Sequence, residues 1–194
     1  INPVLVNGYV NARRKDGVKD GTIRNELLIL RAAFRWGSQS KGWVTIIPKI
    51  EAPPAGAPRE RWITRDDAER LIKAATVPHI KLFMLIALYT GARTGAILDL
   101  EWDRVDFKNN RIDFRVSGRR ESKKRRAAVP IAKSLLPALT EAYNARRTDF
   151  VIEHGGKNVR RVDRGFAQAA KRALLSGVTP HTLRHTAATW MAQA

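Results

Sequence analysis

The pattern of apolar and polar residues predicts a chain built mainly of helices. Stretches with apolar residues at helical spacing, bounded by capping residues or by glycine and proline, are typical of such elements. They predict helices at residues 2–14, 22–38, 64–75, 79–89, 95–100, 132–146, 161–175 and 180–194. Thr22, Thr64 and Thr179 are the expected N-caps, and Gly91 is the expected stop after an apolar run.

One region predicts β-structure. Residues 111–116 alternate apolar and polar side chains, as a half-buried strand does, and residues 127–131 could pair with them. The predicted fold class is therefore mainly α with a small antiparallel β-sheet.

A proline-rich segment divides the sequence. Residues 51–60 contain three prolines and a glycine, which cannot continue a helix and are typical of a semi-rigid spacer. We therefore predict two domains, a small helical one at residues 1–50 and a larger α+β one at residues 61–194. Because Ile1 is not a natural start residue, the first domain is expected to be incomplete at its N-terminus.

The charge of the chain points to a polyanionic partner. The 194 residues include 36 Lys and Arg against 18 Asp and Glu, a formal net charge of +18. Such an excess opposes compaction unless an anion neutralises it, which favours nucleic acid first and an anionic membrane surface second. The absence of cysteine excludes disulfides and thiolate metal sites. No apolar run approaches the roughly 20 residues of a membrane span, so we expect a cytoplasmic protein without a membrane partner.

A basic run at residues 118–126 holds six cations in nine residues, between the two predicted strands. The run is either a solvated hairpin loop or a loop that enters a nucleic-acid groove, where its cations would displace counterions. Its candidate DNA-binding residues are Arg119, Arg120, Lys124, Arg125 and Arg126.

The segment from Thr179 to Thr186 carries the most specific chemical signal. Thr179 and Pro180 are suited to the N-cap and first position of a helix, which places His181 in the first turn, where unpaired backbone N–H groups attract anions. Arg184 follows on the same face and could grip a phosphate with two hydrogen bonds. The helix end disfavours imidazolium, so His181 could be neutral and available for proton transfer. The alternative is a capped surface helix with an incidental histidine.

Three other features have alternative interpretations. Arg93, in the connector after Gly91, is either an exposed cap or a fixed phosphate clamp. His185 is expected to pack in the core. Although His181 and His185 have metal-ligand spacing, the glutamate of a metalloprotease helix is missing between them, so we expect no metal site.

Two of these segments, with the basic loop between them, resemble the tyrosine recombinase (phage integrase) family. The stretch Leu88–Trp102 is similar to the box that contains the family's first catalytic arginine, which matches Arg93. The stretch Thr179–Thr186 is similar to its His-x-x-Arg box, so His181 and Arg184 match the catalytic pair. The basic loop lies where the family carries a catalytic lysine, for which we prefer Lys123 to Lys124. The sequence departs from the family at Ala96, where an acid is usual.

The resemblance implies a fold and an activity. Residues 1–50 would form a core-binding, DNA-binding domain, and residues 61–194 an integrase-type catalytic domain truncated at its C-terminus. The protein would be a site-specific recombinase, the integrase of a mobile element, that cuts and rejoins double-stranded DNA through a 3′-phosphotyrosyl intermediate in DNA integration and recombination. It would need no cofactor and would self-assemble on DNA.

The nucleophile of this reaction is expected beyond Ala194. Tyr9, Tyr89 and Tyr143 match no nucleophile position of the family, so the chain is expected to be a fragment that lacks it. The main alternative is a non-catalytic, sequence-specific DNA-binding module or a decayed integrase. An RNA-binding protein and a membrane-surface protein are further alternatives, but neither is supported by a matching motif.

Overall fold

The computed structural model describes residues 1–56, 61–115 and 127–193. The chain divides into two compact units, Ile1–Arg59 and Glu60–Ala194, each with its own cluster of buried apolar side chains. The basic loop at residues 118–126 lies outside the described residues.

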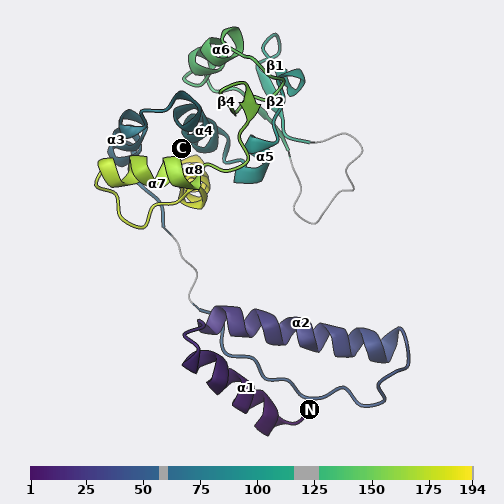
Figure 1. Ribbon diagram of the computed structural model, residues 1–194. Helices are drawn as coiled ribbons and strands as arrows, with labels where there is room; N and C mark the ends of the chain where they lie inside the picture. The colour runs from purple at the N-terminus through teal and green to yellow at the C-terminus, as the bar shows by residue number, and fades with distance from the viewer. Residues whose placement is uncertain (57–60, 116–126, 194) are drawn as a thin grey trace. The chain divides into compact units, whose positions relative to one another are not determined.

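The N-terminal unit consists of two helices, α1 (Pro3–Lys15) and α2 (Asp20–Gln39), followed by an extended segment (Figure 1). The helices bury Val6 and Val10 against Ile23 and Leu27, and Ile50 of the extended segment completes this cluster. A polar network also joins them: Arg13 Nη2 donates to Glu26 Oε1 at 2.7 Å, and the hydroxyl of Tyr9 donates to Glu26 Oε2 at 2.7 Å.

The predicted start of the second helix is wrong by two residues. The helix begins at Asp20, with Lys19 as its N-cap, so Thr22 lies inside the first turn. The Asp20 carboxylate, which is paired with Arg14 at 2.8 Å, lies at the positive end of the helix dipole, where an acid is favourable.

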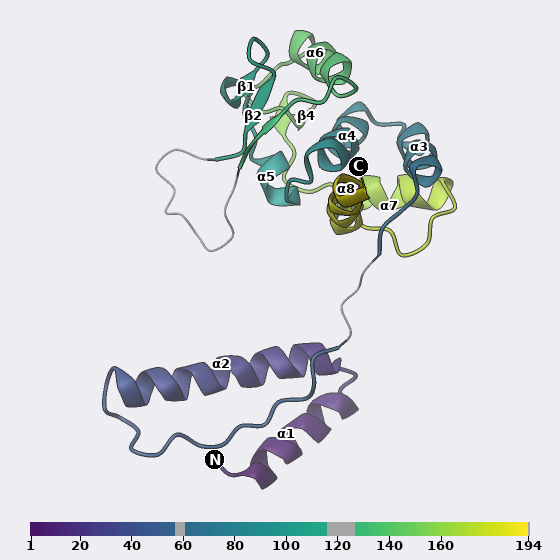
Figure 2. The same cartoon turned by 180° about the vertical axis from the view of Figure 1, so that it is seen from behind.

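The C-terminal unit is built around α4 (Pro78–Thr90), whose apolar residues are buried over most of its length. Four helices surround it: α3 (Arg65–Ala74), α5 (Thr94–Leu98), α6 (Leu136–Asn144) and α8 (Pro180–Gln193). The remaining helix, α7 (Asp163–Arg172), lies along α3 (Figures 1 and 2). Helix α6 starts four residues later than predicted, with Pro137 in its first turn, where the missing N–H carries no penalty.

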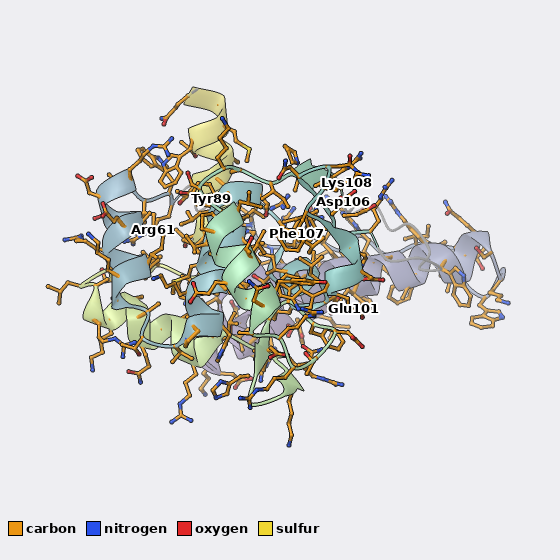
Figure 3. All side chains as sticks on the ribbon, turned by 90° about the horizontal axis from the view of Figure 1, so that it is seen from above. Arg61, Tyr89, Glu101, Asp106, Phe107 and Lys108 are labelled. Carbon is orange, nitrogen blue, oxygen red and sulfur yellow. The ribbon has the colours of Figure 1, made fainter. Side chains whose placement is uncertain are left out.

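A three-stranded antiparallel sheet lies beside these helices. It has the order β1 (Val105–Asp106), β2 (Arg111–Asp113) and β3 (Ala128–Pro130), with Ile112 opposite Val129, and a 3₁₀ turn (Trp102–Arg104) precedes it. The predicted pairing of these two segments is therefore confirmed at residues 111–113 and 128–130, and the predicted fold class is confirmed as well. In the β1–β2 turn, Asp106, Phe107 and Lys108 follow one another (Figure 3), and the Asp106 carboxylate accepts from the Asn109 backbone N–H at 2.9 Å.

A second, two-stranded hairpin was not predicted. It joins β4 (Glu153–His154) to β5 (Lys157–Asn158) through Gly155 and Gly156, whose φ angles are +59° and +72°. Two successive residues in the left-handed region form the tight turn that a hairpin favours, and glycine adopts this conformation without strain.

Candidate active site

The C-terminal end of α4 positions Arg93. Gly91 ends the helix in the left-handed conformation, at φ +62°, and its N–H donates to the carbonyl of Ala87 at 3.0 Å. Two residues later Arg93 is extended, and its own carbonyl accepts from Ala96 N at 2.8 Å and Ile97 N at 3.1 Å, which starts α5. The backbone of Arg93 is therefore fixed on both sides.

The start of α8 positions His181 and Arg184. The backbone N–H of Thr179 donates to Thr182 Oγ1 at 3.1 Å, and the Thr182 N–H donates to the carbonyl of Thr179 at 2.9 Å. These bonds close the first turn after Thr179, as a capping box does. Farther along, buried Thr186 accepts from the Ile63 N–H at 3.1 Å, so this face of the helix is anchored inward.

The turn before α8 contains a glycine in the left-handed conformation. Gly177 has a φ of +66°, and a Cβ at this position would lie 2.8 Å from Arg61 Nη1. The guanidinium of Arg61, labelled in Figure 3, lies against this turn, and the left-handed φ of Gly177 is the reason that glycine is favoured here.

The structure brings Arg93 and Arg184 together across more than 90 residues of sequence. Arg184 Nη1 donates to the carbonyl of Gly91, two residues before Arg93. Burial lowers the pKa of Arg184, and the positive charge of Arg93 lowers it further. Two guanidinium groups repel each other at this separation, and an anion between or beside them would relieve the repulsion.

His181 lies next to this pair with its charge suppressed. Burial lowers its pKa from 6.5, and the neighbouring His185 and Arg184 add to the shift. The rings of His181 and His185 meet edge to face, with centroids 4.5 Å apart. The prediction that His185 packs in the core is wrong, because its side chain is exposed while its neighbours Thr182, Leu183 and Thr186 fill the interior.

These groups have the chemistry to hold an anion next to a proton acceptor. Two guanidinium groups can bind the non-bridging oxygens of a phosphate, and the first turn of α8 presents its dipole at the same place. A neutral imidazole can accept a proton near pH 7. Among residues 1–56, 61–115 and 127–193, no group of three or more His, Asp or Glu side chains could hold a metal ion.

The structure describes only three of the predicted site residues. Lys123 and the DNA-binding candidates of the basic loop lie outside the described part of the chain; these are Arg119, Arg120, Lys124, Arg125 and Arg126. Sequence reasoning missed the carbonyl of Gly91 as the partner of Arg184, because no residue type marks a backbone acceptor.

A second basic surface was also missed. Arg24, Arg31 and Arg35 line one groove of about 540 Å³ in the N-terminal unit, together with Lys49. Their spacing of seven and four residues puts them on one face of α2, and this spacing was the signal in the sequence. Arg24 Nη1 donates to the carbonyl of Pro53 at 2.7 Å, whereas Arg31 and Arg35 are exposed.

Comparisons with known proteins agree on one family. The model of the phage integrase family matches residues 61–194. The tyrosine recombinase XerC of Thermodesulfovibrio yellowstonii is 25% identical over 208 residues, which cover 96% of this chain and 67% of that protein. The integrase of Salmonella phage P22 is 29% identical, with 86% of this chain and 44% of that protein covered. The chain thus spans between two fifths and two thirds of these relatives.

Solved structures show the same fold. A lambda integrase dimer bound to a COC′ core site has a TM-score of 0.78 at 21% identity, over 97% of this chain and 72% of that chain. The Tn1549 transposon integrase in complex with transposon right end DNA has a TM-score of 0.80 at 18% identity, over 100% of this chain and 73% of that chain. Because the family model matches most of the sequence, including Arg93, His181 and Arg184, the chain belongs to the phage integrase family of tyrosine recombinases.

Proposed function

We propose that the protein containing this chain is a site-specific DNA recombinase that acts in DNA integration and recombination. The observation that carries the proposal is the pairing of Arg93 with Arg184 at the Gly91 turn, beside a neutral His181. This arrangement suits a phosphodiester, which presents two non-bridging oxygens and gains negative charge in the transition state.

In the proposed reaction a tyrosine hydroxyl attacks the phosphorus of one strand. The new O–P bond replaces the bond to the 5′ oxygen, which leaves a 3′-phosphotyrosyl link and a free 5′ hydroxyl. Arg93 and Arg184 bind the non-bridging oxygens, and His181 accepts the proton of the attacking hydroxyl. Lys123, or Lys124 beside it, gives a proton to the leaving oxygen. A 5′ hydroxyl of another strand reverses these steps and rejoins the DNA.

The nucleophile in this proposal comes from outside residues 1–194. The three tyrosines of the chain have other surroundings. The hydroxyl of Tyr9 donates a hydrogen bond to Glu26 in the N-terminal unit, and Tyr89 packs against the core of the C-terminal unit. The ring of Tyr143 meets Trp102 edge to face and lies under the guanidinium of Arg146.

The proposed partner is double-stranded DNA, on which several copies assemble. We propose that residues 1–50 form the core-binding domain, joined through residues 51–60 to the catalytic domain at residues 61–194. The groove of Arg24, Arg31 and Arg35 supports backbone binding by the first domain. Similar structures of lambda integrase include a tetramer bound to a Holliday junction, which supports assembly on DNA. No helix in the described parts of the chain is long and apolar enough to cross a membrane, and we propose a cytoplasmic location.

Covalent trapping tests the proposal. The full-length gene product is incubated with a nicked duplex carrying its attachment site, because loss of the short cleaved piece prevents rejoining. We expect a protein–DNA band that survives denaturation and disappears with Arg93→Ala or Arg184→Ala. If the wild-type protein binds the duplex without any such band, the proposed activity is wrong.

A non-catalytic DNA-binding module is the second candidate. Ala96 favours it, because a buried alanine occupies the position where the family usually carries an acid. This candidate predicts binding whose logarithm falls linearly with the logarithm of salt concentration, and no covalent adduct from the full gene product.

A further inference from the structure

The side chain of Thr90 closes the last turn of α4. Its hydroxyl donates to the carbonyl of Ile86 at 2.6 Å and accepts from the backbone N–H of Ala92 at 3.2 Å. The first bond holds the hydroxyl against the helix, and the second holds the chain that leaves it. Thr90 therefore ties both sides of the Gly91 turn together.

The Gly91 turn connects two parts of the candidate site, the carbonyl that binds Arg184 and the backbone of Arg93. The Gly91 carbonyl, which accepts from Arg184, lies between Thr90 and Ala92, and Ala92 is joined directly to Arg93. A rotation of the Gly91–Ala92 peptide would move the acceptor of Arg184 and the backbone of Arg93 at once. Gly91, which lies at φ +62°, has no Cβ to restrict such a rotation.

We infer that Thr90 is a positioning residue, whose hydroxyl fixes the Gly91 turn so that Arg93 and Arg184 are aligned on one phosphate. The inference rests on the proposed function for its ligand, and on the hydrogen bonds of Thr90, Gly91 and Arg184 for its geometry. In this inference the side chain of Thr90 restricts the Gly91 turn, which the backbone alone would leave free to rotate.

Two substitutions separate the hydroxyl from the shape of the side chain. Thr90→Val keeps the branched shape and removes both bonds, which leaves the half-buried Ala92 N–H without its acceptor. Thr90→Ser keeps the hydroxyl. A matched control is Thr140→Val in α6, because Thr140 also donates to the carbonyl four residues earlier, at 3.0 Å, but contacts no site residue in the described structure.

The experiment follows the arginine side chains by NMR in the 194-residue chain. The signals of Arg184 are assigned through their loss in Arg184→Lys, and inorganic phosphate is the titrated probe. The wild type and the Thr90→Ser and Thr140→Val variants should have the same phosphate affinity. In all three proteins, solvent exchange of the Arg184 guanidinium should be slower than in Thr90→Val. In Thr90→Val we expect faster exchange and an affinity about fivefold weaker, the factor that corresponds to one neutral hydrogen bond.

The outcomes distinguish the inference from the function it rests on. Equal exchange and affinity in Thr90→Val and the wild type would overturn the inference, as would a Thr90→Ser protein that behaves like Thr90→Val. If Thr90→Val changes the Arg184 exchange but the wild type binds no phosphate, the positioning role is supported and the proposed phosphate chemistry fails. An effect of Thr140→Val as large as that of Thr90→Val would also overturn the inference, because the weaker phosphate binding would then reflect a general loss of stability.

Discussion

The guanidinium of Arg184 is partly desolvated in the candidate site. It is half-buried, its guanidinium is bound by a carbonyl, and its charge lies near that of Arg93. A planar fork with several donors can satisfy the carbonyl and a phosphate together, which an ammonium group on a flexible stem does less well. The residue type therefore matters here beyond its charge.

Arg184→Lys in the full-length protein is expected to slow covalent adduct formation by about 100-fold, the usual loss when one oxyanion donor is removed. The measurement is the initial rate of adduct formation on the nicked duplex. Arg172→Lys is the control, because Arg172 also donates to a carbonyl, that of Ala74 at 2.9 Å, but belongs to α7 and is not one of the candidate site residues. Equal losses in the two variants would contradict a specific role for the Arg184 fork.

A histidine pair outside the site should make stability depend on pH. The rings of His79 and His154 have centroids 4.7 Å apart, and burial, followed by the charge of His154, lowers the pKa of His79 from 6.5. The unfolded chain therefore takes up this proton at a higher pH than the folded one. The free energy of unfolding should fall as the pH is lowered through 6.5.

His79→Gln is expected to reduce this dependence, because an amide does not titrate. The measurement is the free energy of urea unfolding of the wild type and the variant at about pH 7.5 and about pH 5.5, on either side of the ordinary histidine pKa. An identical change with pH in both proteins would show that the pair does not contribute.

At the scale of the elements, close packing of helices depends on small residues at particular positions. Gly165 of α7 faces the first turn of α4, where a Cβ would lie 2.8 Å from both Cγ1 and Cδ1 of Ile80. Ile80 is buried and branched, so it cannot easily move away.

Gly165→Ala is therefore expected to destabilise the C-terminal unit by about 1–3 kcal/mol, as overpacking does, despite the better helix propensity of alanine. Gly95→Ala in α5 has nothing within 4 Å of the new Cβ and should instead be neutral or stabilising. The measurement is the free energy of unfolding of both variants and the wild type, by chemical denaturation. A Gly165→Ala protein as stable as the wild type would show that α7 can shift away from α4.

The elements differ in how well the sequence predicts them. All eight predicted helices are confirmed, because capping residues and apolar spacing act within one turn of the chain. The N-cap of α3 is an example, with Thr64 Oγ1 accepting from Asp67 N at 3.1 Å. The β4–β5 hairpin was missed because strands of two residues show no periodicity.

At the scale of the whole molecule, positive charge is present in both compact units. If both bind DNA, the exposed arginines of α2 should contribute to the salt dependence of binding. Each phosphate contact changes the slope of log affinity against log salt by about 0.9, so Arg31→Ala/Arg35→Ala should make it shallower by about 1.8.

The measurement is the affinity for a duplex, by fluorescence anisotropy, over a range of salt concentrations. Arg14→Ala is the control, because Arg14 is already paired with Asp20 at 2.8 Å and should change the slope little. An unchanged slope in the double variant would remove the α2 groove from the proposed DNA-binding surface.

The sequence by itself determined the local features of this protein: its helices, the β2–β3 pairing, and the residue types of the candidate site at Arg93, His181 and Arg184. These depend on propensities, caps and motifs that act over a few residues. Only the tertiary structure decided that α4 and α8 pack together, that the Gly91 carbonyl accepts a hydrogen bond from Arg184, and that desolvation lowers the pKa of His181. The physical reason is that proximity and desolvation depend on contacts between segments some 90 residues apart, and no local pattern encodes the distance between them.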